Sequence, residues 1–196
     1  MTDPLFEDDD EANTPLTADE RAALIPTYIA LRSELNEVEQ ANIADAVDWA
    51  LSRKRDVLDE AFLRELHKRM FGDVWKWAGQ YRTTPRNIGI DAYRIHQELP
   101  QLIGDVKYWI ENGTYQPDEI AVRFKHKLVF IHPFPNGNGR FSRLAGDLLA
   151  LQLGQSRFTW GGANLTEPET ARKQYIAALH VADNHDIGPL LAFARS

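Results

Sequence analysis

The chain has 196 residues, of which 43% are hydrophobic and 26% charged, as in an ordinary water-soluble globular protein. It contains no cysteine, which excludes disulfides, thiolate metal sites and a cysteine nucleophile. No apolar run approaches the ~20 residues that a membrane-spanning helix needs, and the acidic first ten residues are unlike a signal peptide. We therefore expect a cytoplasmic protein without a membrane partner.

The formal net charge of −7 arises in the first 20 residues. That segment holds eight acidic side chains and no Lys or Arg, so the rest of the chain carries 21 acidic and 22 basic residues. An acidic block of this kind is typical of a solvated, disordered tail. The remainder has no overall basic charge that would attract nucleic acid, so we predict no nucleic-acid partner.

The segments that follow the tail favour helices. A capping-box pattern at residues 17–20 predicts the start of a short helix that Pro26 interrupts. Apolar residues recur at mostly helical spacing over 27–52, and residues 59–71 have the pattern of an amphipathic helix.

Residues 72–96 differ in composition. They hold three glycines and a proline between β-favouring residues, which predicts a loop and a β-hairpin. Helical periodicity then returns in segments 99–111, 117–131, 140–153, 168–183 and 187–194. The expected fold class is mainly α, a helical bundle with one small β-hairpin.

The segment from His132 to Arg140 reads His-Pro-Phe-Pro-Asn-Gly-Asn-Gly-Arg and lies between two predicted helices. Its glycines allow backbone N–H groups to converge at a helix N-terminus, which predicts an anion site of the kind that binds phosphate. Arg140 and Arg143 lie three residues apart, on one face of the first turn, and can contact phosphate oxygens. The amide of Asn138 can add a further contact.

His132 opens the same loop, and its neutral imidazole can accept a proton from an attacking hydroxyl. A base beside a phosphate site is the arrangement needed to move a nucleotidyl or phosphoryl group onto an alcohol. Taken alone, Gly-Asn-Gly is also common in structural turns, and a histidine before proline can simply cap a helix. The combination of the histidine, the glycines and both arginines favours chemistry.

This loop resembles the Fic-family motif, His-x-Phe-x-(Asp/Glu)-Gly-Asn-Gly-Arg-x-x-Arg, which it matches from His132 to Arg143 except at Asn136. Residues 77–82 and 88–89 are similar to the family's flap region, and segments 175–179 and 186–190 are similar to its last helices. The resemblance covers about residues 55–195. Residues 34–43 and the Pro-Asn form of the motif also resemble the Fic subgroup called mobile mystery protein B.

The resemblance implies a Fic domain over 55–196, preceded by the tail, 1–20, and by a helical region, 21–54, to which an inhibitory role can be assigned. It implies an enzyme, a protein adenylyltransferase that moves AMP from ATP to a Ser, Thr or Tyr hydroxyl of a target protein. An antitoxin-like protein is a candidate regulator. His132 would be the general base, and the nucleotide phosphates would meet Gly137, Asn138, Gly139, Arg140 and Arg143.

Asn136 is the departure from the motif, because the family has Asp or Glu there to hold Mg²⁺. An amide oxygen can ligate Mg²⁺ but brings no charge, so weakened metal binding is expected. Three hypotheses stay open: a slow transferase, an enzyme that transfers another phosphate-containing group, and a catalytically silent nucleotide-binding regulator. The first is favoured because the base and both arginines remain.

The family's flap would comprise Ile88, Gly89 and Ile90, along which a target segment pairs by strand addition. A plain surface hairpin is the alternative. The family would place Tyr175 and Asp183 in its adenosine pocket, although core packing and a helix cap explain these two equally well.

The segment Ser33-Glu-Leu-Asn-Glu37 partly resembles the inhibitory signature Ser/Thr-x-x-x-Glu-(Gly/Asn) of autoinhibited Fic proteins. A glutamate that pairs with Arg143 would remove a γ-phosphate contact. Val38 stands where Gly or Asn belongs, and Glu34 is an equally good candidate on the same helix. The alternative is a solvated, charged helix face.

Overall fold

A computed structural model describes residues 22–26, 28, 32–162 and 168–196, and the mainly α fold is confirmed in this part of the chain. The acidic tail and the capping-box pattern at 17–20 lie outside the described residues. None of the described helices is long and apolar enough to cross a membrane. The elements are α2 (Arg32–Leu51), α3 (Glu60–Phe71), the 3-10 helix η2 (Ala92–Arg94), α4 (Ile95–Glu111), α5 (Pro117–Ile131), α6 (Asn138–Gln152), α7 (Pro168–Asp183) and α8 (Gly188–Arg195).

Local chemistry explains the helix starts that the sequence predicts well. The side chain of Asp59 caps α3 by accepting a hydrogen bond from the N–H of Ala61 at 3.1 Å. Pro117 occupies the first turn of α5, where its missing N–H has no helical partner to lose. Helix α4 begins earlier than predicted, at Ile95, and includes Pro100, because the apolar face of this helix is buried in the core.

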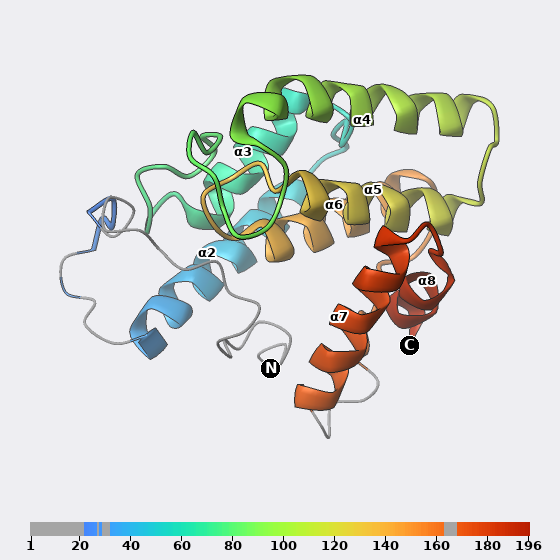
Figure 1. Ribbon diagram of the computed structural model, residues 1–196. Helices are drawn as coiled ribbons and strands as arrows, with labels where there is room; N and C mark the ends of the chain where they lie inside the picture. The colour runs from blue at the N-terminus through green and yellow to red at the C-terminus, as the bar shows by residue number, and fades with distance from the viewer. Residues whose placement is uncertain (1–21, 27, 29–31, 163–167) are drawn as a thin grey trace.

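Helices α5 and α6 lie side by side at the centre of the molecule (Figure 1). Helix α4 packs on α5, while α2 packs on α3 at one end and α7 packs on α8 at the other. Gly146 lets α5 and α6 approach closely, because a Cβ there would lie 3.0 Å from the Cβ of Lys125. The loop that joins α5 to α6 packs on Phe71 at the end of α3.

Residues 72–91 contain no β-strand in the described chain, so the prediction of a β-hairpin is wrong. They form turns, bends and extended chain, and the only pairing that the described residues show is an isolated antiparallel bridge between Leu24 and Trp75. Pro85 lacks an N–H donor, and the guanidinium of Arg82 takes the carbonyls of Thr84 and Ile90 as acceptors. A side chain thus occupies groups that a hairpin ladder would have used.

Candidate active site

The motif loop starts and ends at residues with left-handed backbone. His132 ends α5 with φ 54°, and Gly137 precedes α6 with φ 75°. A Cβ at Gly137 would lie 2.5 Å from Cζ of Phe71, so the packing of the loop on α3 requires glycine at this position. By contrast, among the described residues outside its own stretch of helix, no atom lies within 4 Å of a Cβ built at Gly139. Packing therefore does not explain Gly139, which faces open space at the start of α6.

The side chain of Asn138 holds the loop together. Its Oδ1 accepts the N–H of Phe134 at 2.9 Å, and its Nδ2 donates to the carbonyl of Phe134 at 2.8 Å. The side chain is only 2% exposed. The side-chain amide of Asn138 is therefore bonded on both sides to the backbone of Phe134, and its predicted contact with phosphate stays a prediction.

His67 on α3 contacts the motif loop directly, a role that the sequence analysis missed. Its Nδ1 accepts the N–H of Gly79 at 3.0 Å, so Nε2 carries the proton and donates to the carbonyl of Asn136 at 3.1 Å. The ring stacks on Phe134 with centroids 3.7 Å apart. Burial lowers the pKa of His67 to about 3, which keeps the ring neutral. The available signal was a histidine on the apolar face of an amphipathic helix.

His132, the predicted base, is 4% exposed. Burial, followed by the charge of Arg82, lowers its pKa to about 4, although a hydrogen bond to the backbone of Val129 acts in the opposite direction. The imidazole is consequently neutral at pH 7 and able to accept a proton. The backbone of Gly89 lies directly against this side chain, because a Cβ at Gly89 would lie 2.5 Å from the Cβ of His132.

The two motif arginines leave the same helical turn toward different neighbours. Arg140 forms an ion pair with Glu39 of α2, with Nη1 to Oε2 at 2.7 Å, and its guanidinium lies 4.9 Å from the ring centre of Phe71. Arg143 is 6% exposed, and its guanidinium lies 5.5 Å from the ring centre of Tyr175. The first two turns of α6 therefore carry two guanidinium groups, one against Glu39 of α2 and one against Tyr175 of α7.

Glu39 of α2, a residue that the sequence analysis did not single out, forms an ion pair with a motif arginine. Glu37 is exposed and Glu34 is half-buried, whereas Glu39 is 6% exposed and also accepts a hydrogen bond from Trp75 Nε1 at 2.6 Å. The partner of Glu39 is Arg140, and the predicted pairing of Glu37 or Glu34 with Arg143 stays a prediction. A sequence signal existed, because Glu39 lies on the stripe of α2 that continues through the buried residues Asn42, Ala46 and Ala50.

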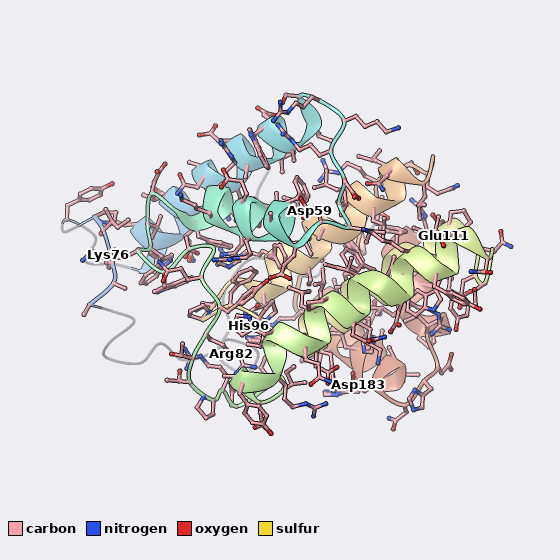
Figure 2. The ribbon with its side chains drawn as sticks, turned by 90° about the horizontal axis from the view of Figure 1, so that it is seen from above. Asp59, Lys76, Arg82, His96, Glu111 and Asp183 are labelled. Carbon is pink, nitrogen blue, oxygen red and sulfur yellow. The ribbon has the colours of Figure 1, made fainter. Side chains whose placement is uncertain are left out.

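Tyr175 and Asp183 of α7 both contact α5. The hydroxyl of Tyr175 is hydrogen-bonded to Nζ of the fully buried Lys125, and the carboxylate of Asp183 lies 2.8 Å from Nε2 of His126. Figure 2 shows Asp183 at the end of α7. These contacts hold α7 on α5, and the place of the two residues in an adenosine pocket stays a prediction.

Asn136 does not provide a good Mg²⁺ ligand. Its Oδ1 accepts the N–H of Gly137 at 2.6 Å, and the described residues contain no cluster of three or more His, Cys, Asp or Glu that could hold a metal ion. Mg²⁺ prefers carboxylate oxygens that bring negative charge. The side chains of this loop therefore do not fit a protein-held Mg²⁺.

The predicted flap residues lie on the connection that runs from α3 to α4, on which Figure 2 labels Arg82. Ile88 is 45% exposed, while Gly89 has φ 92° and Ile90 is half-buried against the core. Nε of Arg86 donates to the carbonyl of Pro135 at 3.3 Å, which ties this connection to the motif loop. The structure thus brings the flap segment beside His132 without the strands of a hairpin.

Known proteins resemble this chain in sequence and in fold. Protein adenylyltransferase fic-1 of Caenorhabditis elegans is 29% identical over 147 residues, which cover 73% of this chain and 28% of that protein. Protein adenylyltransferase Fic of Drosophila grimshawi is 29% identical over 192 residues, or 93% of this chain and 38% of that protein. The chain therefore spans less than two fifths of the length of these curated relatives.

A solved N-terminal Fic domain of a VirB-translocated Bep effector protein from Bartonella quintana, with bound ADP, has the same fold. It superposes with a TM-score of 0.67 at 18% identity and covers 90% of this chain and 94% of that one. The model of the Fic/DOC family matches residues 57–150, a range that includes His132, both motif arginines and most of α6. Residues 57–150 of this chain therefore form a domain of the Fic/DOC family.

Proposed function

We propose that this protein transfers AMP from ATP to a hydroxyl group of a target protein. The observation that carries the proposal is a buried, neutral imidazole, His132, one short loop away from two guanidinium groups at a helix N-terminus. The names of both relatives, protein adenylyltransferase, and the ADP bound to the Bartonella domain support it. Within this proposal the acceptor is a Ser, Thr or Tyr hydroxyl, and an antitoxin-like protein is a candidate regulator.

In the proposed reaction the acceptor oxygen attacks the α-phosphorus of ATP while His132 takes the hydroxyl proton. The bond from the α-phosphorus to the oxygen that bridges to the β-phosphate breaks, and pyrophosphate leaves. Arg140 and Arg143 bind the phosphates together with the backbone of the Gly137–Gly139 segment. Because a triphosphate is strongly anionic, its arrival raises the pKa of His132 from about 4 and makes the imidazole a better base. No step is assigned to a protein-held metal, since the loop does not fit one.

Glu39 supports a further part of this proposal, namely that the described conformation is inhibited. Its carboxylate occupies Arg140, a guanidinium that the nucleotide phosphates require. The side chains of Glu39 and Arg140 are 8% and 18% exposed, so water screens their attraction only weakly. ATP must therefore displace Glu39 or bind with one phosphate contact fewer.

Labelled ATP tests both parts of the proposal. We expect self-labelling or target labelling to rise by roughly tenfold in Glu39→Gln, which keeps an acceptor for Trp75 but removes the charge, and in Glu39→Gly. Glu37→Gly is the matched control because Glu37 is exposed on the same helix, and it should label as the wild type does. Equal labelling by the Glu39 and Glu37 variants would refute the inhibitory role, and no labelling by any of them would refute the transferase.

A catalytically silent nucleotide-binding regulator is the second candidate, and the contact between Asn136 and Gly137 favours it. Asn136→Asp keeps an acceptor for Gly137 and adds the missing charge. In the transferase reading, we expect this variant to bind ATP roughly tenfold more tightly with Mg²⁺ than without, and to label faster than the wild type. Calorimetry of ATP binding with and without Mg²⁺, together with labelling, separates the two. A variant that gains Mg²⁺-dependent binding but still transfers nothing favours the regulator.

A further inference from the structure

The guanidinium of Arg82 has an unusual set of partners. This side chain belongs to a residue that is 3% exposed, on the connection between α3 and α4 that Figure 2 labels. Nε donates to the carbonyl of His132 at 2.6 Å, and Nη1 donates to that of Thr84 at 3.1 Å. Nη2 donates to the carbonyl of Ile90 and, at 3.4 Å, to that of Ile131. One cation thus binds backbone from two separate segments.

The first of these segments is the end of α5, where the conformation of His132 needs support. A non-glycine residue with φ 54° is strained, and His132 adopts this conformation where the chain leaves the helix. The backbone N–H of Arg82 also donates to the carbonyl of the next residue, Pro133, at 3.0 Å. Arg82 therefore holds the chain on both sides of the peptide bond that follows the proposed base.

The second segment is the flap, where Arg82 holds the carbonyls of Thr84 and Ile90. Gly89 lies between these two residues and packs on the side chain of His132. A Cβ at Gly89 would lie 2.5 Å from the Cβ of His132 and 3.1 Å from Nη2 of Arg82. The flap, the guanidinium and the base are therefore in direct contact.

We propose that Arg82 is a positioning residue that fixes the flap and His132 as one unit, so that an acceptor segment lying on the flap meets the imidazole in a set register. The proposal rests on the transferase function and explains how a flap without strands can still present an acceptor. Alignment of this kind affects the transfer step more than nucleotide binding, because the phosphate contacts come from the start of α6.

Three variants test this role in the full-length protein, each in the wild-type and Glu39→Gly backgrounds. Arg82→Gln removes the cation, whereas Arg82→Lys keeps the charge and one donor group. Arg195→Lys is the matched control, because Arg195 also donates to two backbone carbonyls, those of Ser156 and Arg157, away from the loop. Thermal unfolding, ATP affinity, labelling kinetics and the titration of the His132 ring by NMR are measured for each.

We expect Arg82→Gln to lower kcat for labelling by roughly 100-fold while the Kd for ATP changes by less than about threefold. Arg82→Lys should recover part of kcat, and Arg195→Lys should lose thermal stability without losing kcat. Because the charge of Arg82 lowers the pKa of His132, this pKa should rise in Arg82→Gln and stay low in Arg82→Lys.

A folded Arg82→Gln protein with wild-type kcat, or with an unchanged His132 titration, would overturn the proposal. So would a loss of kcat that Arg82→Lys does not recover at all. Should Arg82→Gln fail to fold, Arg82→Lys decides the matter through its kcat and its ATP affinity, measured against Arg195→Lys. If neither the wild type nor Glu39→Gly labels anything, the transferase proposal fails, and the ring titration alone then tests the contact between Arg82 and His132.

Discussion

The two ends of the motif loop are stabilised in opposite ways. At the histidine end, the guanidinium of Arg82 binds neutral backbone carbonyls, and Gly89 covers the side chain of His132. At the arginine end, Gly139 faces open space and Arg140 meets the carboxylate of Glu39. In the proposed reaction no anion replaces the carbonyl groups that bind Arg82. A phosphate group of ATP, by contrast, can replace the carboxylate of Glu39 on Arg140. The proposed base is thus fixed in place before substrate binds, whereas in the proposed phosphate site Arg140 is already paired with a carboxylate.

The largest expected effect is on the labelling rate, when a residue at one end of the loop is replaced and compared with a replacement beyond the other end. His132→Ala should lower the labelling rate by about 10²–10⁴-fold, because no side chain then takes the proton of the attacking hydroxyl. The affinity for ATP should stay nearly unchanged. Arg143→Ala should mainly weaken ATP binding, by roughly tenfold or more, because it removes a charged phosphate contact. Labelling kinetics and calorimetry measure the two effects. A His132→Ala protein that labels at the wild-type rate would show that this end of the loop holds no base.

The two glycines of the loop sharpen the contrast in terms of stability. Gly137→Ala should destabilise the fold by about 2–4 kcal/mol, because φ is 75° and the new Cβ would clash with the ring of Phe71. Gly139→Ala should change the free energy of unfolding by less than about 1 kcal/mol, because no described residue beyond its own helical turn comes within 4 Å of the new Cβ. Urea unfolding measures both. If Gly139→Ala also leaves ATP binding intact, the open space at Gly139 is not part of the phosphate site.

The sequence predicted the parts of this molecule that depend on neighbouring residues. The bounds of α5 follow from Pro117 at its first turn and from the apolar periodicity, and the motif spacing places His132 at the end of α5 and Arg140 in the first turn of α6. Such features depend on local propensity and on the helical repeat, both of which are readable from a short window of sequence.

The missed features all depend on residues that are distant along the chain. The carbonyls of the expected hairpin bind Arg82, whose remaining bonds reach His132, 50 residues away. The contact between Glu39 and Arg140 joins α2 to α6. In both cases tertiary packing brings a buried charged side chain to its partner, because a buried charge needs one. Neither the periodicity of apolar residues nor the spacing of a motif predicts which partner that is. A buried polar residue on an apolar stripe, as at Glu39 and His67, was the one readable sign.

The smallest expected effect is the dependence of the free energy of unfolding on pH, which tests the contact of His67 with the motif loop. The pKa of His67 is about 3 in the folded protein, below the usual 6.5 that it regains on unfolding. Between these values the unfolded chain binds more protons, so the free energy of unfolding falls as the pH decreases. We expect His67 alone to remove about 2 kcal/mol between pH 7 and 5. His132, with a pKa of about 4, acts in the same direction.

Urea unfolding across this range measures the slope. His67→Gln can still accept from Gly79 and donate to the carbonyl of Asn136, but it does not titrate, so it should flatten the pH dependence even if it lowers the overall stability. His132 keeps its own share of the slope in this variant. If the slope of His67→Gln equals that of the wild type, then the ring of His67 becomes protonated in the folded wild-type protein. In that case the loop would rest on a support that yields in mild acid, and the contrast between a rigid base and an exchangeable anion site would hold only near neutral pH.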